Sequence, residues 1–336
     1  MNIDSIKVKF PIHCLTDYKR SAFKDYTEDV YNDSGELSDS KTYKKLIGKK
    51  HLGLKDIALY ETSGNVTVEM SAKILKENYF SLINLNTIEN VFQNINALGL
   101  IEINVPESIG SAAVLKCDVT TDLYIEDIPR YLRSLSAYKV NQKYDCEIYP
   151  TSIVFDKRVK TPALREYLTF YDKATELKRD RELLKYVPIK DAKNKLRSES
   201  RCTNLQQIRN AIEQTDLSLL SVLESEGNPN LKIFNRITQG ISEVEHNAIE
   251  NFQKLIDMKK TNYHKDIRNA LGDNDILKLC NYDIELVKIY LATNSTANNS
   301  RLLRHLKSRL KAKNEFESAK TIETDIQEIR SLLSIA

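Results

Sequence analysis

Four short segments of this chain alternate polar and apolar residues with a period of two, the pattern of a β-strand that has one buried face. They lie far apart in the sequence, at 66–71, 115–122, 167–173 and 196–201. Side by side, they would gather carboxylates, cations and tyrosine hydroxyls on one face of a single sheet. The polar residues on that face are Thr67, Glu69 and Ser71; Lys116, Asp118 and Thr120; Tyr167, Thr169, Tyr171 and Lys173; and Arg197, Glu199 and Arg201.

The rest of the first two hundred residues mixes strand and helix signals. Residues 5–12 and 147–155 alternate as strands, the second interrupted at Pro150, and a turn at Ser63-Gly64-Asn65 predicts a hairpin between 57–60 and 66–70. Helical periodicity is present at 87–98 and 125–138. This mixture predicts an α+β domain with an antiparallel sheet, in which helices cover one face and the other stays open as a groove.

Strand signals vanish after residue 204. The segments 205–223, 231–260, 276–291 and 301–333 all have helical patterns. We therefore predict two domains, an antiparallel-sheet domain over 1–204 and an all-helical domain over 205–336.

Composition narrows the class of protein. The chain has 336 residues, a formal net charge of +3 and five scattered cysteines with no C-x-x-C pair. It shows neither a signal-peptide pattern at the start nor an apolar run of about 18 residues that could span a membrane. These features predict a soluble intracellular protein with reduced thiols, whose nucleic-acid surface, if it has one, comes from local clusters of charge.

The carboxylates on the predicted polar face are candidate metal ligands. Mg²⁺ and Mn²⁺ prefer carboxylate oxygens, so Asp118, Glu199 and Glu69 could hold one of these ions beside a phosphate group. Taken singly, each carboxylate is more typical of a solvated strand face than of a metal site. The three together with tyrosines favour metal-assisted attack on a phosphodiester.

Tyr171 is the candidate nucleophile. A phenol has a pKa near 10, so a metal ion or Lys173 would have to stabilise its anion. Tyr167 is the competing nucleophile on the same face, and packing is the ordinary role of either ring. The chain has no pair of histidines two residues apart, no H-E-x-x-H and no glycine-rich phosphate loop, so nothing predicts an ATPase or a zinc enzyme.

The most basic stretch lies at 301–313. Its leucines line one helical face, while Arg301, Arg304 and Lys307 lie on the rest. After a polar loop at 293–300, this stretch could be the second helix of a helix-turn-helix against DNA, or an ordinary amphipathic helix with a solvated face.

Four segments, in order, have the content of motifs from one protein family. They are Val68-Glu69-Met70-Ser71-Ala72-Lys73-Ile74-Leu75; Lys116-Cys117-Asp118-Val119-Thr120; Leu168-Thr169-Phe170-Tyr171-Asp172-Lys173 with Glu176-Leu177; and Leu196-Arg197-Ser198-Glu199-Ser200-Arg201. Over roughly residues 50–205 the chain resembles the phage and plasmid rolling-circle replication initiators of the filamentous-phage gene-two type. It departs from them at Ser198, where the family usually has an aromatic residue, and matches poorly after residue 205.

The resemblance implies a bacterial cytoplasmic enzyme that nicks one strand of origin DNA. Tyr171 would attack a phosphate polarised by Mg²⁺ or Mn²⁺ on Asp118 and Glu199, with Glu69 as a further candidate. The products would be a 5′-phosphotyrosine and a 3′-OH primer. Lys173 would stabilise the phenolate, and Arg197, Arg201 and Lys116 would bind phosphate oxygens. The implied partners are origin DNA in duplex and single-stranded form, a host helicase and a polymerase, with a homodimer as one arrangement.

Two other classes stay open. A tyrosine recombinase would also form a phosphotyrosine but needs no metal, so its cleavage would resist EDTA. A plasmid initiator without catalytic activity would bind origin DNA and leave it uncut.

Overall fold

The structure of the chain is a computed structural model. It describes residues 1–31, 37–48, 51–138, 141, 143–157, 159–161, 164–238, 285–286, 288–289 and 300–335. The chain forms two compact units, one of residues 1–132, 142–237 and 329–336, and the other of residues 133–141 and 238–328. All four predicted polar strands lie in the first unit.

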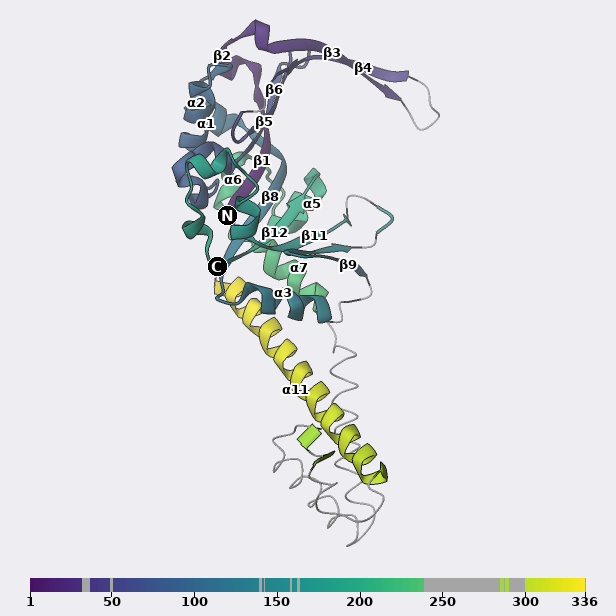
Figure 1. Ribbon diagram of the computed structural model, residues 1–336. Coiled ribbons are helices and arrows are strands. Elements are labelled where there is room, and N and C mark those ends of the chain that lie inside the picture. Colours follow the sequence, from purple (N-terminus) through teal and green to yellow (C-terminus); the bar gives the residue numbers. More distant parts are fainter. Residues whose placement is uncertain are drawn as a thin grey trace. The chain divides into compact units, whose positions relative to one another are not determined.

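A ten-stranded antiparallel sheet dominates the first unit (Figure 1). Its strand order is β3-β4-β5-β6-β1-β8-β12-β11-β10-β9, and β2 pairs with β7 in a separate two-stranded sheet. The strands are β1 (Ile3–Pro11), β2 (Leu15–Tyr18), β3 (Phe23–Tyr31), β4 (Leu37–Leu46), β5 (Leu54–Tyr60), β6 (Asn65–Ser71), β7 (Ile101–Ile103), β8 (Ala113–Tyr124), β9 (Tyr144–Tyr149), β10 (Ser152–Lys157), β11 (Tyr167–Asp172) and β12 (Lys195–Cys202). The α+β class and the large antiparallel sheet predicted from the sequence are confirmed.

The predicted polar strands are near neighbours in this sheet. β8, β12 and β11 are consecutive, and β1 lies between β6 and β8. The predicted hairpin joins β5 to β6, with Gly64 in the left-handed region at φ +66°. The single strand predicted over 147–155 is in fact a hairpin, because the chain turns around Pro150 between β9 and β10.

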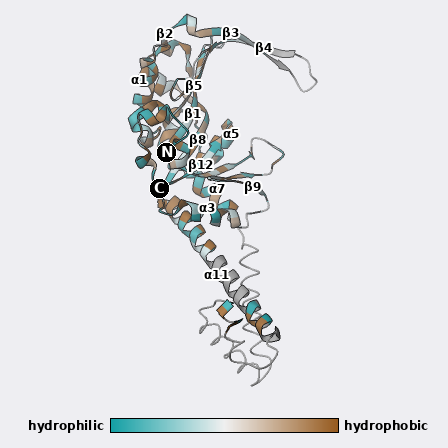
Figure 2. Ribbon diagram, in the orientation of Figure 1, coloured by the Kyte–Doolittle hydropathy of each residue, from teal (hydrophilic) through white to brown (hydrophobic). Residues whose placement is uncertain are grey.

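Apolar side chains of the opposite face form the core with the helices. Val66, Val68 and Met70 of β6 are fully buried there, as are Val91 and Phe92 of helix α1 (Ile88–Ala97). Figure 2 shows hydrophobic and hydrophilic residues together along α1, as expected for a helix with one buried face. Further along the sheet, helix α7 (Pro229–Ile237) packs on β8, β11 and β12, and its Phe234 meets Phe170 edge-on at 5.6 Å.

The polar face is not an open groove throughout. The 3-10 helix η3 (Ala72–Ser81) and helix α4 (Lys173–Leu177) close over it beside the start of β12. Arg197, on that face, has no exposed surface. The predicted open groove is therefore corrected, because tyrosine and lysine side chains from these two segments cover one end of the polar face.

The sheet-containing unit extends past the predicted boundary at residue 204. Helices α5 (Leu205–Ile212) and α6 (Leu219–Glu224) contact β8, and α7 packs on three strands. Helix α2 (Val105–Ser111) contacts α6 and β1. The end of the chain also returns to this unit, where Asn228 donates a hydrogen bond to the Leu333 carbonyl at 2.7 Å.

The predicted C-terminal helices are described only in part. Helix α11 runs without a break from Ser300 to Ile335, which confirms the helix predicted at 301–333. Of the segment predicted helical at 231–260, the described residues end at Thr238, and of 276–291 only four residues are described. The loop at 293–299 lies outside the described residues, so the helix-turn-helix stays a prediction.

Two hydrogen bonds join described residues of the second unit, where Leu306 and Ile326 are also fully buried. Ser134 of helix α3 (Ile128–Ala137) donates to the buried Asp325 carboxylate of α11 at 2.6 Å. The Tyr138 hydroxyl donates to the Thr238 carbonyl at 3.4 Å. In the described part of the chain, no helix combines the length and the apolar character needed to cross a bilayer.

Candidate nucleophile and carboxylate site

Strand registers bring the predicted residues into neighbouring rows of one face. Glu199 on β12 lies between Thr120 on β8 and Thr169 on β11. In the next row, Arg197 lies between Asp122 and Tyr171. On the other side of Glu199, Arg201 pairs with Asp118, which in turn pairs with Ser5 of β1. Tyr171, Glu199 and Asp118 are thus placed on three adjacent strands.

Tyr171 and Glu199 are joined directly. The Tyr171 hydroxyl donates a hydrogen bond to Glu199 Oε2 at 3.0 Å. Burial, and next the neighbouring Glu199 charge, raise the pKa of Tyr171 well above its ordinary value. Burial, together with the charges of Asp4 and Asp118, raises the pKa of Glu199 to about 7. The pair therefore combines a protonated phenol with a carboxyl group that titrates near neutral pH.

Asp118 has a buried oxygen without a hydrogen-bond partner. Its Oδ1 makes no hydrogen bond, and the Arg201 Nε at 3.7 Å is too distant to make one. Burial is the largest cause of the raised pKa of this carboxyl, and the charge of Asp4 raises it further. A hard divalent cation would bind such a buried oxygen and would offset the repulsion between neighbouring carboxylates. Asp118 and Glu199 therefore offer the oxygen donors that Mg²⁺ or Mn²⁺ prefers.

Glu69 lies on the same face but in another environment. Its Oε1 accepts a hydrogen bond from Lys116 Nζ at 3.1 Å, so Glu69 and Lys116 form an ion pair. In the described part of the chain, the three candidate ligand groups that come within 4.8 Å of one another are those of His13, Cys14 and Glu107, which lie outside the polar face. Glu69 is thus the least favoured of the three predicted ligands, and Lys116 is engaged rather than free.

Arg197 is the centre of an ion-pair network that the sequence did not predict. Its Nε and Nη2 donate to the two oxygens of Asp122 at 2.6 and 2.9 Å. Its Nη1 donates to Asp4 Oδ1 at 3.0 Å and to the Tyr79 hydroxyl oxygen at 2.8 Å. The Tyr79 hydroxyl in turn donates to Asp4 at 3.0 Å. Since Arg197 is fully buried with every nitrogen atom engaged, the geometry favours a positioning role rather than the predicted phosphate contact.

Lys173 begins a helix rather than ending a strand. The Asp172 carboxylate caps α4 by accepting from the Ala174 amide, and Lys173 is the first residue of that helix. The buried Lys173 ammonium donates to Glu176 at 2.6 Å and lies 5.5 Å from the centre of the Tyr171 ring. Burial, and then the charge of Arg197, lower its pKa. It thus lies beside the ring of the predicted nucleophile.

Tyr167, the competing nucleophile, is placed at the far end of β11. Its ring is covered by the Arg165 guanidinium at 4.4 Å from the ring centre. Arg165 itself is held by both oxygens of Asp156. Both rings thus lie near a cation, and the Tyr171 hydroxyl also has a carboxylate as its proton acceptor.

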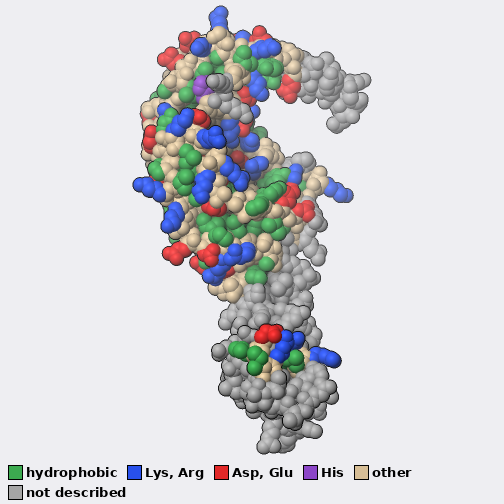
Figure 3. All heavy atoms as spheres, viewed as in Figure 1, with side chains coloured by type: hydrophobic (Ala, Val, Ile, Leu, Met, Phe, Trp, Pro, Cys, Tyr) green, Lys and Arg blue, Asp and Glu red, His purple; other side chains and the backbone are tan. Residues whose placement is uncertain are grey.

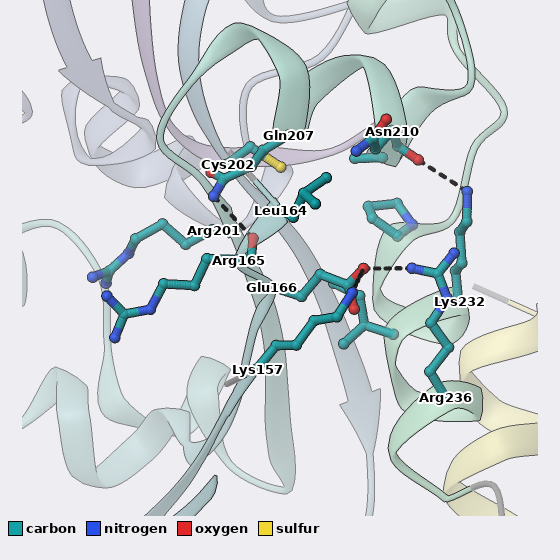
Figure 4. A pocket seen from close by; sticks show the side chains of 13 residues that line it. Lys157, Leu164, Arg165, Glu166, Arg201, Cys202, Gln207, Asn210, Lys232 and Arg236 are labelled. Atoms are coloured by element: carbon teal, nitrogen blue, oxygen red, sulfur yellow. Dashed lines mark hydrogen bonds and ion pairs between the residues drawn. The ribbon is translucent and has the colours of Figure 1, made fainter. Parts of the chain in front are cut away.

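Arg201 also lines a cavity of about 140 Å³ beyond the end of β12 (Figure 4). The cavity lies among β10, residues 164–166 before β11, the end of β12, α5 and α7, and five cationic residues line it. All five are paired: Lys157 and Arg236 bind Glu166, Lys232 binds Glu213, Arg165 binds Asp156, and Arg201 lies 3.7 Å from Asp118. Of the predicted site residues, only Arg201 reaches this cavity. With its side chain 57% exposed, Arg201 is well placed for a ligand that approaches Asp118 from solvent.

The predicted duplex-binding residues lie on α11. Arg304 and Lys307 are exposed, and Arg301 belongs to the same helix. On the face of the molecule in Figure 3, Lys and Arg side chains are interspersed with Asp and Glu, and no single-sign surface covers the described residues there. This agrees with a net charge of only +3.

Asp122, Asp4 and Tyr79 are the residues that sequence reasoning missed. Asp122 had a signal, because it continues the alternation of Asp118 and Thr120 on β8. Asp4 had none, since it is an extra residue where the β1–β8 register shifts between Ile3 and Ser5. No sequence signal pointed to Tyr79 either, because it belongs to the 3-10 helix η3, which has no clear periodic pattern.

Comparisons with known protein families, curated proteins and solved structures find no match to this chain.

Proposed function

We propose that this protein is a DNA nickase and strand transferase that initiates rolling-circle replication of a phage or plasmid in the cytoplasm of a bacterial host. The observation that carries this proposal is the hydrogen bond from Tyr171 to Glu199, one row from the buried Asp118 oxygen that has no hydrogen-bond partner. Metal-assisted phosphoryl transfer by a tyrosine needs a nucleophile, a group that accepts its proton and a carboxylate oxygen that can bind a metal ion.

The covalent step would be a transesterification. As the Tyr171 oxygen attacks phosphorus, its proton passes along the 3.0 Å hydrogen bond to Glu199 Oε2. The bond from phosphorus to the 3′ oxygen breaks. The leaving oxygen takes a proton from water, and Glu199 returns its proton to solvent, so the products are the phosphotyrosine and a 3′-OH with no net change in protons. The new phosphotyrosine keeps the phosphodiester energy, so the reverse attack rejoins the ends without ATP.

Burial gives a physical reason for a metal requirement. The pKa of Tyr171 is raised, so the resting side chain is a neutral phenol and a poor nucleophile. A divalent cation supplies positive charge that stabilises the phenolate and polarises the phosphate. Asp118 Oδ1 and the second oxygen of Glu199 would hold it, leaving Glu199 Oε2 for the proton. Lys173 adds charge near the ring, and Arg201 would bind a phosphate oxygen.

The 3′-OH would prime a host polymerase, and strand separation would need a helicase from the host. Origin DNA is the proposed substrate, both as duplex and as single strand. A homodimer remains one proposed arrangement.

The experiment is cleavage of a supercoiled plasmid that carries the DNA flanking this chain's own gene. We expect nicked circles in Mn²⁺ whose retarded gel mobility is restored by protease, and no cleavage in EDTA. Asp118→Asn should abolish nicking with DNA binding retained. Glu69→Gln is the matched control, a carboxylate-to-amide change on the same face, and should have a smaller effect.

Two outcomes point to the other classes. Cleavage that survives EDTA would favour a recombinase-type strand transferase. Binding of the plasmid without any cleavage in Mg²⁺ or Mn²⁺ would favour a non-catalytic initiator.

A further inference from the structure

Three tyrosines stand in a row across one edge of the sheet. Tyr26 of β3 lies directly opposite Tyr43 of β4, and the rings stack with centres 6.0 Å apart and planes 20° apart. Tyr43 stacks in turn on Tyr60 of β5, at 5.0 Å and 30°. Tyr26, at the outer end, is 40% exposed. We call Tyr26, Tyr43 and Tyr60 the tyrosine row.

The tyrosine row lies on the same face as the candidate site. Tyr60 pairs with Asn65, and alternation along β6 places Asn65 on the face of Glu69. Glu69 pairs with Lys7 on β1, and two residues away on that strand Ser5 pairs with Asp118. One face of the sheet thus runs continuously from the tyrosine row to the carboxylates.

Free lysines line the path between them. Lys24, Lys45, Ala58, Thr67 and Lys9 form the row next to the tyrosines, across five consecutive strands. Lys45 is paired with Asp56 at 3.3 Å. In the described part of the chain, Lys24, Lys9 and Lys7 make no ion pair, and the first two are exposed. Their uncompensated positive charge complements a phosphate backbone.

The hairpin that carries this surface projects from the sheet. β4 is paired with β5 only at Lys44 and Lys45, while β3 and β4 pair with each other along their length. Figure 1 shows the hairpin extending past the strands of the main sheet. Stacked rings on such an arm, beside lysines, are the elements of a surface for single-stranded nucleic acid.

We propose that the tyrosine row is a stacking platform for the bases of single-stranded DNA whose phosphates follow Lys24, Lys9 and Lys7 toward Asp118. This deepens the proposed function and rests on it, because it names where the strand joined to the scissile phosphate lies. Tyr60 on β5 is five strands from β11, and Tyr26 on β3 is seven. At about 4.8 Å per strand, Tyr26 is ~34 Å from β11 across the sheet, so a strand that keeps the stacked spacing of about 3.4 Å per nucleotide needs roughly ten nucleotides to reach both.

The test measures the affinity of oligo-dT, at about 15 nucleotides and about 5 nucleotides, by fluorescence anisotropy. Tyr26→Leu removes the ring at the exposed end of the row, where folding depends on it least. We expect the dissociation constant for the longer oligonucleotide to rise roughly 5-fold or more. Tyr26→Phe should bind like wild type, since a phenyl ring stacks equally well. A duplex of the same length should be unaffected.

The control is Ile148→Ala, at a 60% exposed residue on β9, the strand at the opposite edge of the sheet, whose register places it on the face away from Tyr171. It should leave oligo-dT affinity unchanged. Wild-type affinity for the longer oligonucleotide in Tyr26→Leu, equal losses in the control, or no binding by the wild type would each overturn the platform. Nicking at Tyr171 can persist if the platform is wrong, and oligo-dT binding can persist if nicking is never found. The two proposals therefore fail separately.

Discussion

Tyr171 and Glu199 share one hydrogen bond, and burial favours the neutral form of each. The pKa of both groups is raised, that of Glu199 to about 7. When both groups are protonated, the phenol is a poor nucleophile and the carboxyl group cannot accept its proton. Positive charge near Asp118 and Glu199 would lower both pKa values and ready the pair for proton transfer.

The titration of Glu199 should be visible in stability. In the unfolded chain this carboxyl ionises near 4.5, and in the folded protein near 7. Between these pH values the folded state holds a proton that the unfolded chain has lost, so stability falls as pH rises through that window. The fall is at most roughly 3 kcal/mol, at about 1.4 kcal/mol per pKa unit.

Glu199→Gln keeps the shape and the acceptor for Tyr171 but cannot ionise. In EDTA, its free energy of unfolding in urea should exceed that of wild type at pH 8 by more than at pH 4. An advantage of the variant that is the same at both pH values would show that Glu199 titrates normally in the folded protein.

Arg197 gives a second test at the level of single residues. Arg197→Met would leave Asp122 and Asp4 without their main counter-charge in a buried site, which costs about 3–5 kcal/mol. Arg201→Met, at an exposed arginine on the same strand, should cost less than about 1 kcal/mol. Denaturant unfolding measures both. If Arg197→Met lost nicking at wild-type stability, Arg197 would contact phosphate as the sequence first suggested.

At the level of elements, the site depends on how η3 is held against β5. Gly53, in the turn before β5, has φ +78° and accepts a hydrogen bond from the Ser71 amide at 2.7 Å. A Cβ there would lie 2.1 Å from the backbone nitrogen of Ile74 in η3. Because η3 delivers Tyr79 to Arg197, any displacement of Ile74 disturbs the network.

Gly53→Ala should therefore lower the midpoint of thermal unfolding clearly more than Gly64→Ala does. Gly64 also has a positive φ, +66°, but open space surrounds it, so alanine costs only backbone strain of about 1–2 kcal/mol. Equal shifts in the two variants would contradict the close approach of Gly53 to η3.

Sequence patterns predicted the elements that alternate cleanly. The sequence predicted the positions and the polar faces of β6, β8, β11 and β12, because a strand with one buried face alternates polar and apolar residues with a period of two. The β3–β4 hairpin was missed, since it is polar on both faces, with Asp25 and Thr27 on one and Lys24 and Glu28 on the other. Asp4 was missed because a register shift breaks the alternation, and the cover over Arg197 because 3-10 segments carry no period.

At the level of the whole molecule, the two compact units do not follow the predicted division of the chain. Helices after residue 204 complete the core of the sheet-containing unit, and Ile329 and Leu333 near the end of α11 are fully buried. A truncation near residue 205 would therefore expose that core rather than remove a separate domain. Charge substitutions on α11 are the cleaner test of duplex binding.

Arg304→Gln and Lys307→Gln should each lower the slope of log affinity for origin duplex against log salt concentration by about 0.9, if each side chain contacts one phosphate. Both are exposed, so folding should be retained. Lys185→Gln, an exposed lysine in the other unit that pairs with Glu182, is the control and should leave the slope unchanged. Identical slopes in wild type and the α11 variants would exclude this helix from the duplex interface.

The central claim is that Tyr171 is the nucleophile, and the most direct measurement is the identity of the residue that carries the 5′-phosphate. Nicking is run in Mn²⁺ with wild type, Tyr171→Phe and Tyr167→Phe, and the trapped adduct is mapped by mass spectrometry of its peptides. Phenylalanine keeps the packing of either ring and costs at most one hydrogen bond, about 0.5–1.5 kcal/mol. We expect the phosphate on Tyr171, full adduct formation by Tyr167→Phe and none by Tyr171→Phe. A phosphate on Tyr167, or an adduct formed normally by Tyr171→Phe, would contradict the account.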